Sequence, residues 1–275
     1  MALPLAPVVI REASPPIQGK ELAFNVPLGQ GAVVFKERPL VVDAALAVSV
    51  AVGKERYNSR HSWSITEECL KTIPGPELEA LVSKGGYADG IGLVKWEVPG
   101  DDNALEYLVR TYKKPGDLIR RLYDIMSTNV IIADTGLMAM EDGQGHRFHV
   151  PYPRYGFFPL LSRANHSCTP SATLVRPPTE PGVTHVVTTR PVKEGDALTI
   201  DYVQAEPLET KRTFLLENYD FRCACERCRD FCSRLSCNNA GTKVCSACKQ
   251  MRYCCREHQV ADWPRHKMFD CTVKK

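Results

Sequence analysis

The sequence predicts an α+β protein with a β-rich body, a helical insertion and a small metal-binding C-terminus. Three observations predict it. Short apolar runs broken by proline and glycine lie near both ends of the first 205 residues, helical periodicity dominates between about 54 and 145, and ten of the twelve cysteines fall in the last 53 residues. With 275 residues, 44% of them hydrophobic, the chain is long enough for one large core and a satellite module, which excludes disorder over the whole length.

The first elements are short strands followed by helices. Residues 8 to 50 contain the apolar runs VVI, ELAFNVP, GAVVF and LVVDAALAVSVAV. These runs indicate strands and turns, although the last one is equally consistent with a buried helix. Apolar residues then recur at helical spacing in PELEALVSK, NALEYLVRTY and GDLIRRLYDIM, each of which opens near proline, glycine, Asp or Asn. We therefore expect a helical insertion over about 54–145.

Short β-like pieces return over residues 147 to 203, namely RFHV, SATLV, THVVTTR and ALTIDYV, with PPTEPG and VKEGD as turns. The segment LETKRTFLLENY then predicts one amphipathic helix before the cysteine-rich tail. No run approaches the ~18 apolar residues of a membrane span, and the first residues lack the basic region of a signal peptide. We expect an intracellular protein, in the nucleus or the cytoplasm, without a membrane partner.

Charge is unevenly distributed along the chain. Residues 223–275 hold 11 Lys and Arg against 5 Asp and Glu, a formal charge of +6, which leaves −3 on residues 1–222. A basic tail raises nonspecific affinity for nucleic acid in a salt-dependent way. Nothing in this tail resembles a helix that reads a DNA groove, so we expect nucleic-acid binding to be at most weak and nonspecific.

The cysteines of the tail indicate metal binding. In a secreted chain such a cluster would be a disulfide framework, but a reducing compartment keeps thiols free. The short spacings C-x-C and C-x2-C suit tetrahedral zinc better than a compact set of bridges. The sequence therefore favours zinc, with disulfides as the alternative.

Three motifs carry the candidate chemistry. They read NHSCTP at residues 165–170, EGDALTIDY at 194–202 and YDFRCACERC at 219–228. Taken singly, each is typical of packing or turn residues. Taken in this order, they resemble the SET-domain protein lysine methyltransferases over roughly residues 8 to 228, whose signature is N-H-S-C-x-P, then G-E-E-L-T-x-x-Y, then an aromatic-rich post-SET C-x-C-x2-C. The tail resembles a MYND zinc finger, which here follows the SET domain instead of interrupting it.

The resemblance implies a fold and its domains. A β-rich SET fold, a pseudoknotted β-clip, would span residues 8–205 and contain the helical insertion. A post-SET helix and zinc site would occupy 206–229, and a cross-brace MYND finger 230–275. The pseudoknot is a rare threaded topology, and in this family it places the NHSC and LTIDY segments around one cavity.

The resemblance also implies a cofactor and roles for individual residues. In this family S-adenosylmethionine enters from one side, and the target lysine enters through an aromatic channel from the other. Tyr202 would be catalytic and would line the substrate channel with Tyr219. The residues that would hold the cofactor are Gly19, Asn165, His166 and Phe221, and Asn129 matches an upstream cavity residue. The family's G-x-G loop is here Ile17-Gln18-Gly19 or Gly19-Lys20-Glu21, so one glycine is missing in either alignment and a side chain there narrows the pocket.

The same resemblance divides the tail among three structural zinc ions. The post-SET site would use Cys168, Cys223, Cys225 and Cys228, and the finger sites would use Cys232, Cys237, Cys254 and His258, then Cys245, Cys248, His266 and Cys271. In another alignment Cys237 comes first and Ala240 second, which leaves the first finger zinc short of a ligand, with Cys255 or Cys232 as substitute. Because protein fills every position, these zinc ions would be structural.

Two functions follow from these features. The first is an S-adenosylmethionine-dependent protein lysine N-methyltransferase that acts on a histone or nonhistone substrate, favoured by intact Tyr202, Asn165 and His166. The second is an inactive SET/MYND adaptor whose finger binds a proline-containing peptide partner, favoured by the altered glycine loop. In either case we expect the finger to be separable, so that loss of a finger zinc leaves cofactor affinity within a few fold.

Overall fold

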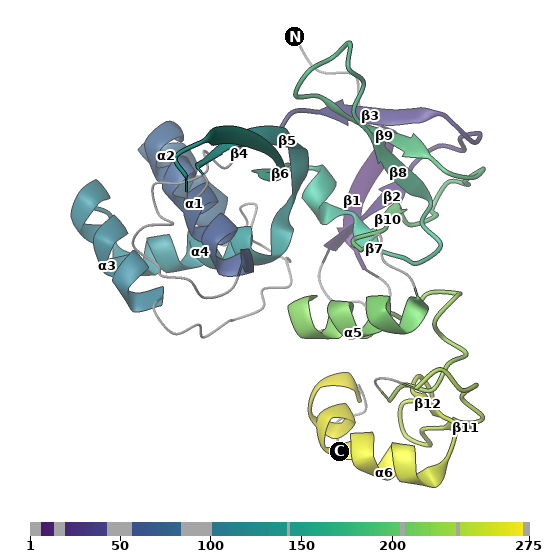
Figure 1. Ribbon diagram of the computed structural model, residues 1–275. Helices are drawn as coiled ribbons and strands as arrows, with labels where there is room; N and C mark the ends of the chain where they lie inside the picture. The colour runs from purple at the N-terminus through teal and green to yellow at the C-terminus, as the bar shows by residue number, and fades with distance from the viewer. Residues whose placement is uncertain are drawn as a thin grey trace. The chain divides into compact units, whose positions relative to one another are not determined.

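The structure is a computed structural model that describes residues 7–13, 20–42, 57–83, 101–141, 144–203, 207–219, 221–234 and 237–271 (Figure 1). The chain divides into two compact units. One, here called the helical unit, comprises 1–7, 32–164 and 174–187, and the other, the cysteine-rich unit, comprises 8–31, 165–173 and 188–275. Each unit contains helices and strands, so the predicted α+β class is confirmed.

The described part of the helical unit contains four α-helices: α1(Tyr57–Thr72), α2(Gly75–Val82), α3(Asp101–Tyr112) and α4(Gly116–Asn129). Pro74 and Pro115 precede α2 and α4, where their fixed φ suits a helix start. The apolar stripes of these helices meet in a core in which Trp63 of α1 stacks on Tyr123 of α4, with ring centroids 4.1 Å apart. The three helices expected from the apolar spacing are confirmed.

The last part of the predicted helical insertion is a strand, so the helical prediction was wrong there. β5(Val130–Glu141) follows α4 directly and pairs antiparallel with β6(Arg147–Phe157), whose other edge pairs with β4(Val41–Val42). The run Val130-Ile131-Ile132 is β-branched, and such residues favour a pleated, half-buried surface over a helix. The ambiguous run that begins at Leu40 lies outside the described residues beyond Val42.

A second sheet has the strand order β3-β9-β8, built from β3(Val33–Glu37), β8(Ala172–Val175) and β9(Thr184–Thr188). Glu37 ends β3 and accepts the backbone N–H groups of Leu160 and Leu161, both at 2.8 Å. Burial raises the pKa of Glu37, and these two hydrogen bonds oppose that rise. The carboxylate thus caps the short 3-10 helix η2(Leu161–Arg163) that leads into the NHSC segment.

The cysteine-rich unit begins with a hairpin of β1(Val8–Glu12) and β2(Lys20–Phe24). The chain later returns beside β2, where Leu198 donates its N–H to the carbonyl of Leu22 at 2.8 Å. There β10(Thr199–Ile200) pairs in parallel with β7(Asn165–His166). This pairing confirms the predicted meeting of the NHSC and LTIDY segments, and α5(Leu208–Tyr219) confirms the predicted helix.

The C-terminal part of the cysteine-rich unit is small, and most residues of its buried cluster are cysteines. It contains the hairpin β11(Lys243–Val244) and β12(Arg252–Tyr253), then α6(Arg256–Arg265) and the π-helical turn η3(His266–Asp270) (Figure 1). Its buried cluster is Cys232, Cys237, Cys245, Met251 and Tyr253. Among the described residues no helix is both long and apolar enough to cross a bilayer.

Candidate active site and zinc clusters

His166 is the centre of the candidate active site. Register places it opposite Ile200, and its ring Nδ1 accepts the backbone N–H of Tyr202 at 3.1 Å. The other ring nitrogen, Nε2, lies 3.3 Å from the sulfur of Cys168. With one nitrogen accepting and the other facing a thiol, these contacts fit the neutral tautomer that carries its proton on Nε2. His166 therefore connects the Tyr202 segment to a cysteine cluster.

Ser171 fastens the NHSC turn to the strand that leads to Tyr202. Its hydroxyl donates to the carbonyl of Ala197 at 3.0 Å and accepts the N–H of Thr199 at 2.9 Å. The Thr199 hydroxyl in turn accepts the N–H of Ser171 at 3.0 Å. The Ser171 side chain is fully buried, and its hydrogen bonds hold the two segments together.

Aromatic side chains surround Tyr202. Its ring centroid lies 5.2 Å from that of Tyr219, 6.4 Å from Phe221 and 5.3 Å from His166. Tyr219 and Phe221 are themselves 6.4 Å apart. The structure thus brings together four residues that the sequence analysis assigned to the site, although 55 positions separate His166 from Phe221.

A buried ion pair beside Tyr202 was missed by the sequence analysis. Lys211 of α5 has a side chain 4% exposed and donates to Asp201 Oδ2 at 2.6 Å. The other oxygen of Asp201 accepts the N–H of Val203 at 3.1 Å. A lysine on a helix usually faces solvent, so the sequence gives no sign that Lys211 is buried. In the structure this pair and the Asp201–Val203 hydrogen bond fix the residues on either side of Tyr202.

Asn165 has a buried amide nitrogen, Nδ2, without a hydrogen-bond partner among the described residues. A buried donor left unpaired is costly, so this atom suits an acceptor supplied by a ligand. Gly19, predicted for the same pocket, lies outside the described residues. Asn129 belongs to the helical unit, where its side-chain amide donates to the carbonyl of Ile125 at 2.9 Å.

All twelve predicted metal ligands fall into the three sets expected from the sequence. Within each set the donor atoms lie within 4.8 Å of one another. The sets are Cys168, Cys223, Cys225 and Cys228, then Cys232, Cys237, Cys254 and His258, then Cys245, Cys248, His266 and Cys271. Cys237 and Cys232 therefore share one cluster, and neither Ala240 nor Cys255 is among its members.

The spacing of the donors suits zinc. With Zn–S bonds of about 2.3 Å, tetrahedral geometry places sulfur atoms about 3.8 Å apart. Cys168 lies 3.9 Å from Cys223 and 3.5 Å from Cys228, and in the next cluster Cys237 lies 3.7 Å from Cys254. Contacts among the four thiols of the first cluster lower the pKa of Cys225 to about 6 and raise the pKa of Cys168 and Cys228.

Two cysteines are outside the clusters. Cys69 of α1 is fully buried, and desolvation raises the pKa of its thiol to about 12, which makes it an inert core residue. Cys255 caps the start of α6 without a side-chain hydrogen bond to the helix, and its sulfur lies 3.8 Å from that of Cys254.

Comparison with known proteins identifies the end of the chain. Residues 225–271 match the family described as MYND finger. This segment is a MYND finger. The match begins within the post-SET cysteines, so it extends across the boundary that the sequence analysis drew at residue 230. The two clusters from Cys232 onward lie within this segment, and their Cys and His donors fit zinc.

Two relatives are similar to parts of the chain. The chain is 30% identical over 113 residues to the SET and MYND domain-containing protein DDB_G0292454 of Dictyostelium discoideum, which covers 41% of this chain and 31% of that protein. It is also 36% identical over 173 residues to the mouse protein-lysine N-trimethyltransferase SMYD5, and this alignment covers 60% of this chain and 37% of that protein. The chain thus spans about a third of the length of these relatives. The resemblance to SET proteins with a MYND finger is confirmed.

Among solved structures, the crystal structure of the SET domain of LSMT bound to lysine and AdoHcy aligns with 81% of this chain and 54% of that chain, at 12% identity and a TM-score of 0.38.

Proposed function

We propose that this chain is an S-adenosylmethionine-dependent protein lysine N-methyltransferase. The observation that carries the proposal is the parallel β7–β10 pairing, which places Asn165 and His166 beside the Tyr202 segment. The printed name of the mouse relative, a protein-lysine N-trimethyltransferase, supports the same reaction. A protein that presents a lysine side chain would be the substrate.

The reaction requires a neutral lysine amine aligned with a methyl group. Lysine has a pKa of about 10.4, so deprotonation at pH 7 costs about 4 to 5 kcal/mol. An apolar channel lowers that cost because it disfavours the charged amine. The rings of Tyr202, Tyr219 and Phe221 would form the wall of such a channel, and the Tyr202 hydroxyl would orient the lysine amine. Positioning of this kind supplies most of the catalysis in a transfer that needs little covalent chemistry from the protein.

The residues of the site fit the cofactor, which supplies the electrophilic sulfonium methyl group when it is bound. The unpartnered Nδ2 of Asn165 would donate to a polar group of S-adenosylmethionine. His166 uses both ring nitrogens within the protein, so its contribution would come through its main chain and its position. The ring of Phe221, whose centroid lies 6.1 Å from that of His166, would cover the side of the cofactor that faces His166.

The three clusters would hold three structural zinc ions. The first would fix Cys168 to the post-SET loop 55 residues later, immediately after Phe221. The MYND finger would bind a protein partner, and a proline-containing peptide suits its exposed apolar residues Val260 and Trp263, which are 57% and 41% exposed. The proposed domain limits are 8–205 for the SET domain, 206–229 for the post-SET helix and zinc site, and 230–275 for the finger.

Tyr202→Phe tests the enzyme directly. Because only one hydroxyl is lost, the variant should keep its affinity for S-adenosylmethionine and lose at least ~10²-fold in methyl transfer to a lysate of acceptor proteins. Radiolabelled methyl incorporation and isothermal calorimetry measure the two quantities. Tyr107→Phe, a tyrosine of α3 in the helical unit, is the matched control. Wild-type turnover by Tyr202→Phe would show that Tyr202 only packs.

The second candidate is the inactive adaptor. The missing glycine beside Gly19 and the exposed apolar side chains of the finger favour it. Calorimetry with millimolar S-adenosylmethionine separates the two functions, because the adaptor would not bind the cofactor. Binding that weakens in Asn165→Ala supports the enzyme and its assigned pocket.

A further inference from the structure

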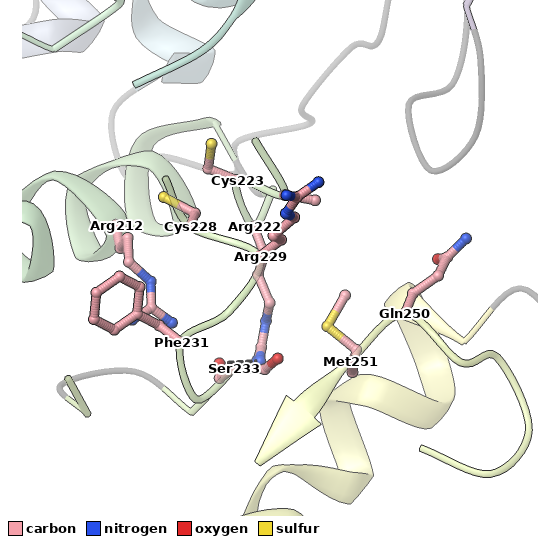
Figure 2. Close-up of a pocket in the computed structure, with 10 residues that line it drawn as sticks. Arg212, Arg222, Cys223, Cys228, Arg229, Phe231, Ser233, Gln250 and Met251 are labelled. Carbon is pink, nitrogen blue, oxygen red and sulfur yellow. Dashed lines mark hydrogen bonds between the residues drawn. The ribbon is translucent and has the colours of Figure 1, made fainter. Parts of the chain in front are cut away.

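A buried ion pair joins the post-SET loop to the MYND finger. Arg222 extends its guanidinium toward the finger (Figure 2) and donates to both carboxylate oxygens of Asp262 in α6, at 2.7 and 2.8 Å. The two side chains are only 9% and 7% exposed. Arg222 also donates to the carbonyl of Ser233 at 2.6 Å. Such a bidentate, desolvated pair fixes distance and orientation, unlike an exposed one.

Arg222 and Asp262 each lie next to residues of the candidate site or of a metal cluster. Arg222 stands between Phe221 of the aromatic cluster and Cys223 of the first zinc cluster. Asp262 also accepts the hydroxyl proton of Tyr253 at 2.8 Å, and this bond and burial raise the pKa of Tyr253. One turn later, His266 donates its backbone N–H to the carbonyl of Asp262 and belongs to the second finger cluster. The position of Asp262 therefore depends on the folded finger.

A second connection runs through α5. Arg212 donates to the carbonyls of Cys237, at 3.1 Å, and Cys232, two residues of the first finger cluster. Its neighbour Lys211 makes the buried pair with Asp201, next to Tyr202. Two neighbouring residues of α5 therefore contact different segments. Arg212 contacts the finger, and Lys211 contacts the candidate catalytic segment.

We infer that the MYND finger forms part of the support of the active site, and that Asp262 and Arg222 are positioning residues that hold Phe221 against the cofactor. The inference rests on the proposed methyltransferase function. It also replaces the expectation that the finger is separable, because the buried Arg222–Asp262 pair and the part-buried hydrogen bonds of Arg212 link the finger to the segments around Phe221 and Tyr202. Loss of either partner leaves the other charge buried and unpaired, which would release the loop that carries Phe221.

The test compares Asp262→Asn with Asp230→Asn in the full chain. Asp262→Asn removes the charge and keeps the shape, whereas Asp230 belongs to an exposed pair with Arg229, 3.9 Å apart and more than 60% exposed on both sides. Three quantities are measured: zinc content by elemental analysis, the Kd for S-adenosylmethionine by calorimetry, and hydrogen exchange of the amides of 221–225 and 199–203. We expect Asp262→Asn to keep the wild-type zinc content, to raise Kd by about 3- to 30-fold and to speed exchange at 221–225. Asp230→Asn should match the wild type.

Arg222→Lys is the second variant, because it keeps the positive charge and touches no finger ligand but lacks the planar fork. If Asp262→Asn loses zinc, Arg222→Lys decides the question by the same three measurements. Full zinc content with wild-type Kd and wild-type exchange would overturn the inference and leave the pair as a support of the finger alone. If the wild type does not bind S-adenosylmethionine, the proposed function fails. The exchange at 221–225 then still shows whether the finger holds Phe221.

Discussion

The helical unit and the MYND finger are stabilised by different interactions. In the helical unit, Trp63, Leu108, Ile119 and Leu122 are fully buried and pack into two apolar cores. In the finger, three of the five residues in the buried cluster are cysteines that belong to zinc clusters. Burial of apolar area stabilises the first region, at about 25 cal/mol per Å², while metal coordination must stabilise the second.

Because of this difference, removal of metal and removal of a core side chain should affect different parts of one chain. A helical core loses stability in proportion to the contacts removed, whereas a small zinc module folds or unfolds with its ion. Each of the following changes tests one side of that contrast.

Chelation of zinc should produce the largest effect. Structural zinc contributes apparent free energies of about 10–16 kcal/mol per ion, so metal removal should unfold the cysteine-rich segment from about residue 223 onward. Hydrogen exchange should rise there to the level of an unfolded chain, while α1–α4 keep their protection. Zinc added back should restore the protection. A chain protected by disulfides would instead resist the chelator and lose protection on reduction, which would contradict the zinc assignment.

Single-cluster variants sharpen the first result. Cys225→Ser and Cys248→Ser remove one ligand each, from the first cluster and from the second finger cluster. We expect each variant to lose one zinc ion and several kcal/mol of stability, measured by elemental analysis and by thermal unfolding. Loss of all zinc in both variants would show that the three clusters fold as one cooperative unit.

Trp63→Ala tests the helical side. Trp63 is fully buried, stacks on Tyr123 and lies beneath the guanidinium of Arg120, 5.7 Å from its ring. We expect a loss of about 3–5 kcal/mol in the free energy of unfolding of the helical unit, with zinc content unchanged. Tyr107→Ala, on an exposed part of α3, should cost no more than ~0.5 kcal/mol. A loss of zinc in Trp63→Ala would mean that the two regions do not fold independently.

Gly156→Ala tests the packing of the sheet. A Cβ at Gly156 would lie 2.8 Å from Cβ of Pro39 and 3.0 Å from Cβ of Ala133, closer than packed carbons allow. We expect a destabilisation of about 1–3 kcal/mol by chemical denaturation. Gly116→Ala, whose Cβ would meet only a methyl group at 3.7 Å, should be neutral or slightly stabilising because it lies in the first turn of α4.

Cys255→Ser should have the smallest effect, with the opposite sign. Serine is a good helix N-cap, and Cys255 caps α6 without a side-chain hydrogen bond. We expect the zinc content to stay the same and the stability to rise by at most about 1 kcal/mol. Its neighbour Cys254, a cluster member, is the matched contrast, since Cys254→Ser should lose a zinc ion. Zinc loss from Cys255→Ser would reassign the first finger cluster.

Sequence reasoning predicted the site better than it predicted parts of the fold. Cysteine spacing predicted that the tail binds metal, while the division of the ligands into three sets came from the family resemblance. The β7–β10 pairing came only from family resemblance, because no local pattern links residues 165–166 to 199–200. β5 was missed because it follows α4 directly, although its β-branched run Val130-Ile131-Ile132 favours a strand. The Arg222–Asp262 pair was not predicted because forty positions separate two ordinary charged residues, whose burial emerges only from tertiary packing.

The separation of Cys168 from its partners has a consequence for biosynthesis. Ribosomes add about 5–20 residues per second, so the 55 residues between Cys168 and Cys223 take roughly 3 to 11 seconds to appear. In the first part of that interval, until Thr199 and Ile200 are added, the nascent chain carries β7 without β10. Throughout the interval Cys168 has no partner thiol from the post-SET loop. A truncated product that ends before Thr199 would lack the other three cysteines of the first cluster and expose an unpaired strand, which makes it a target for chaperones and proteases.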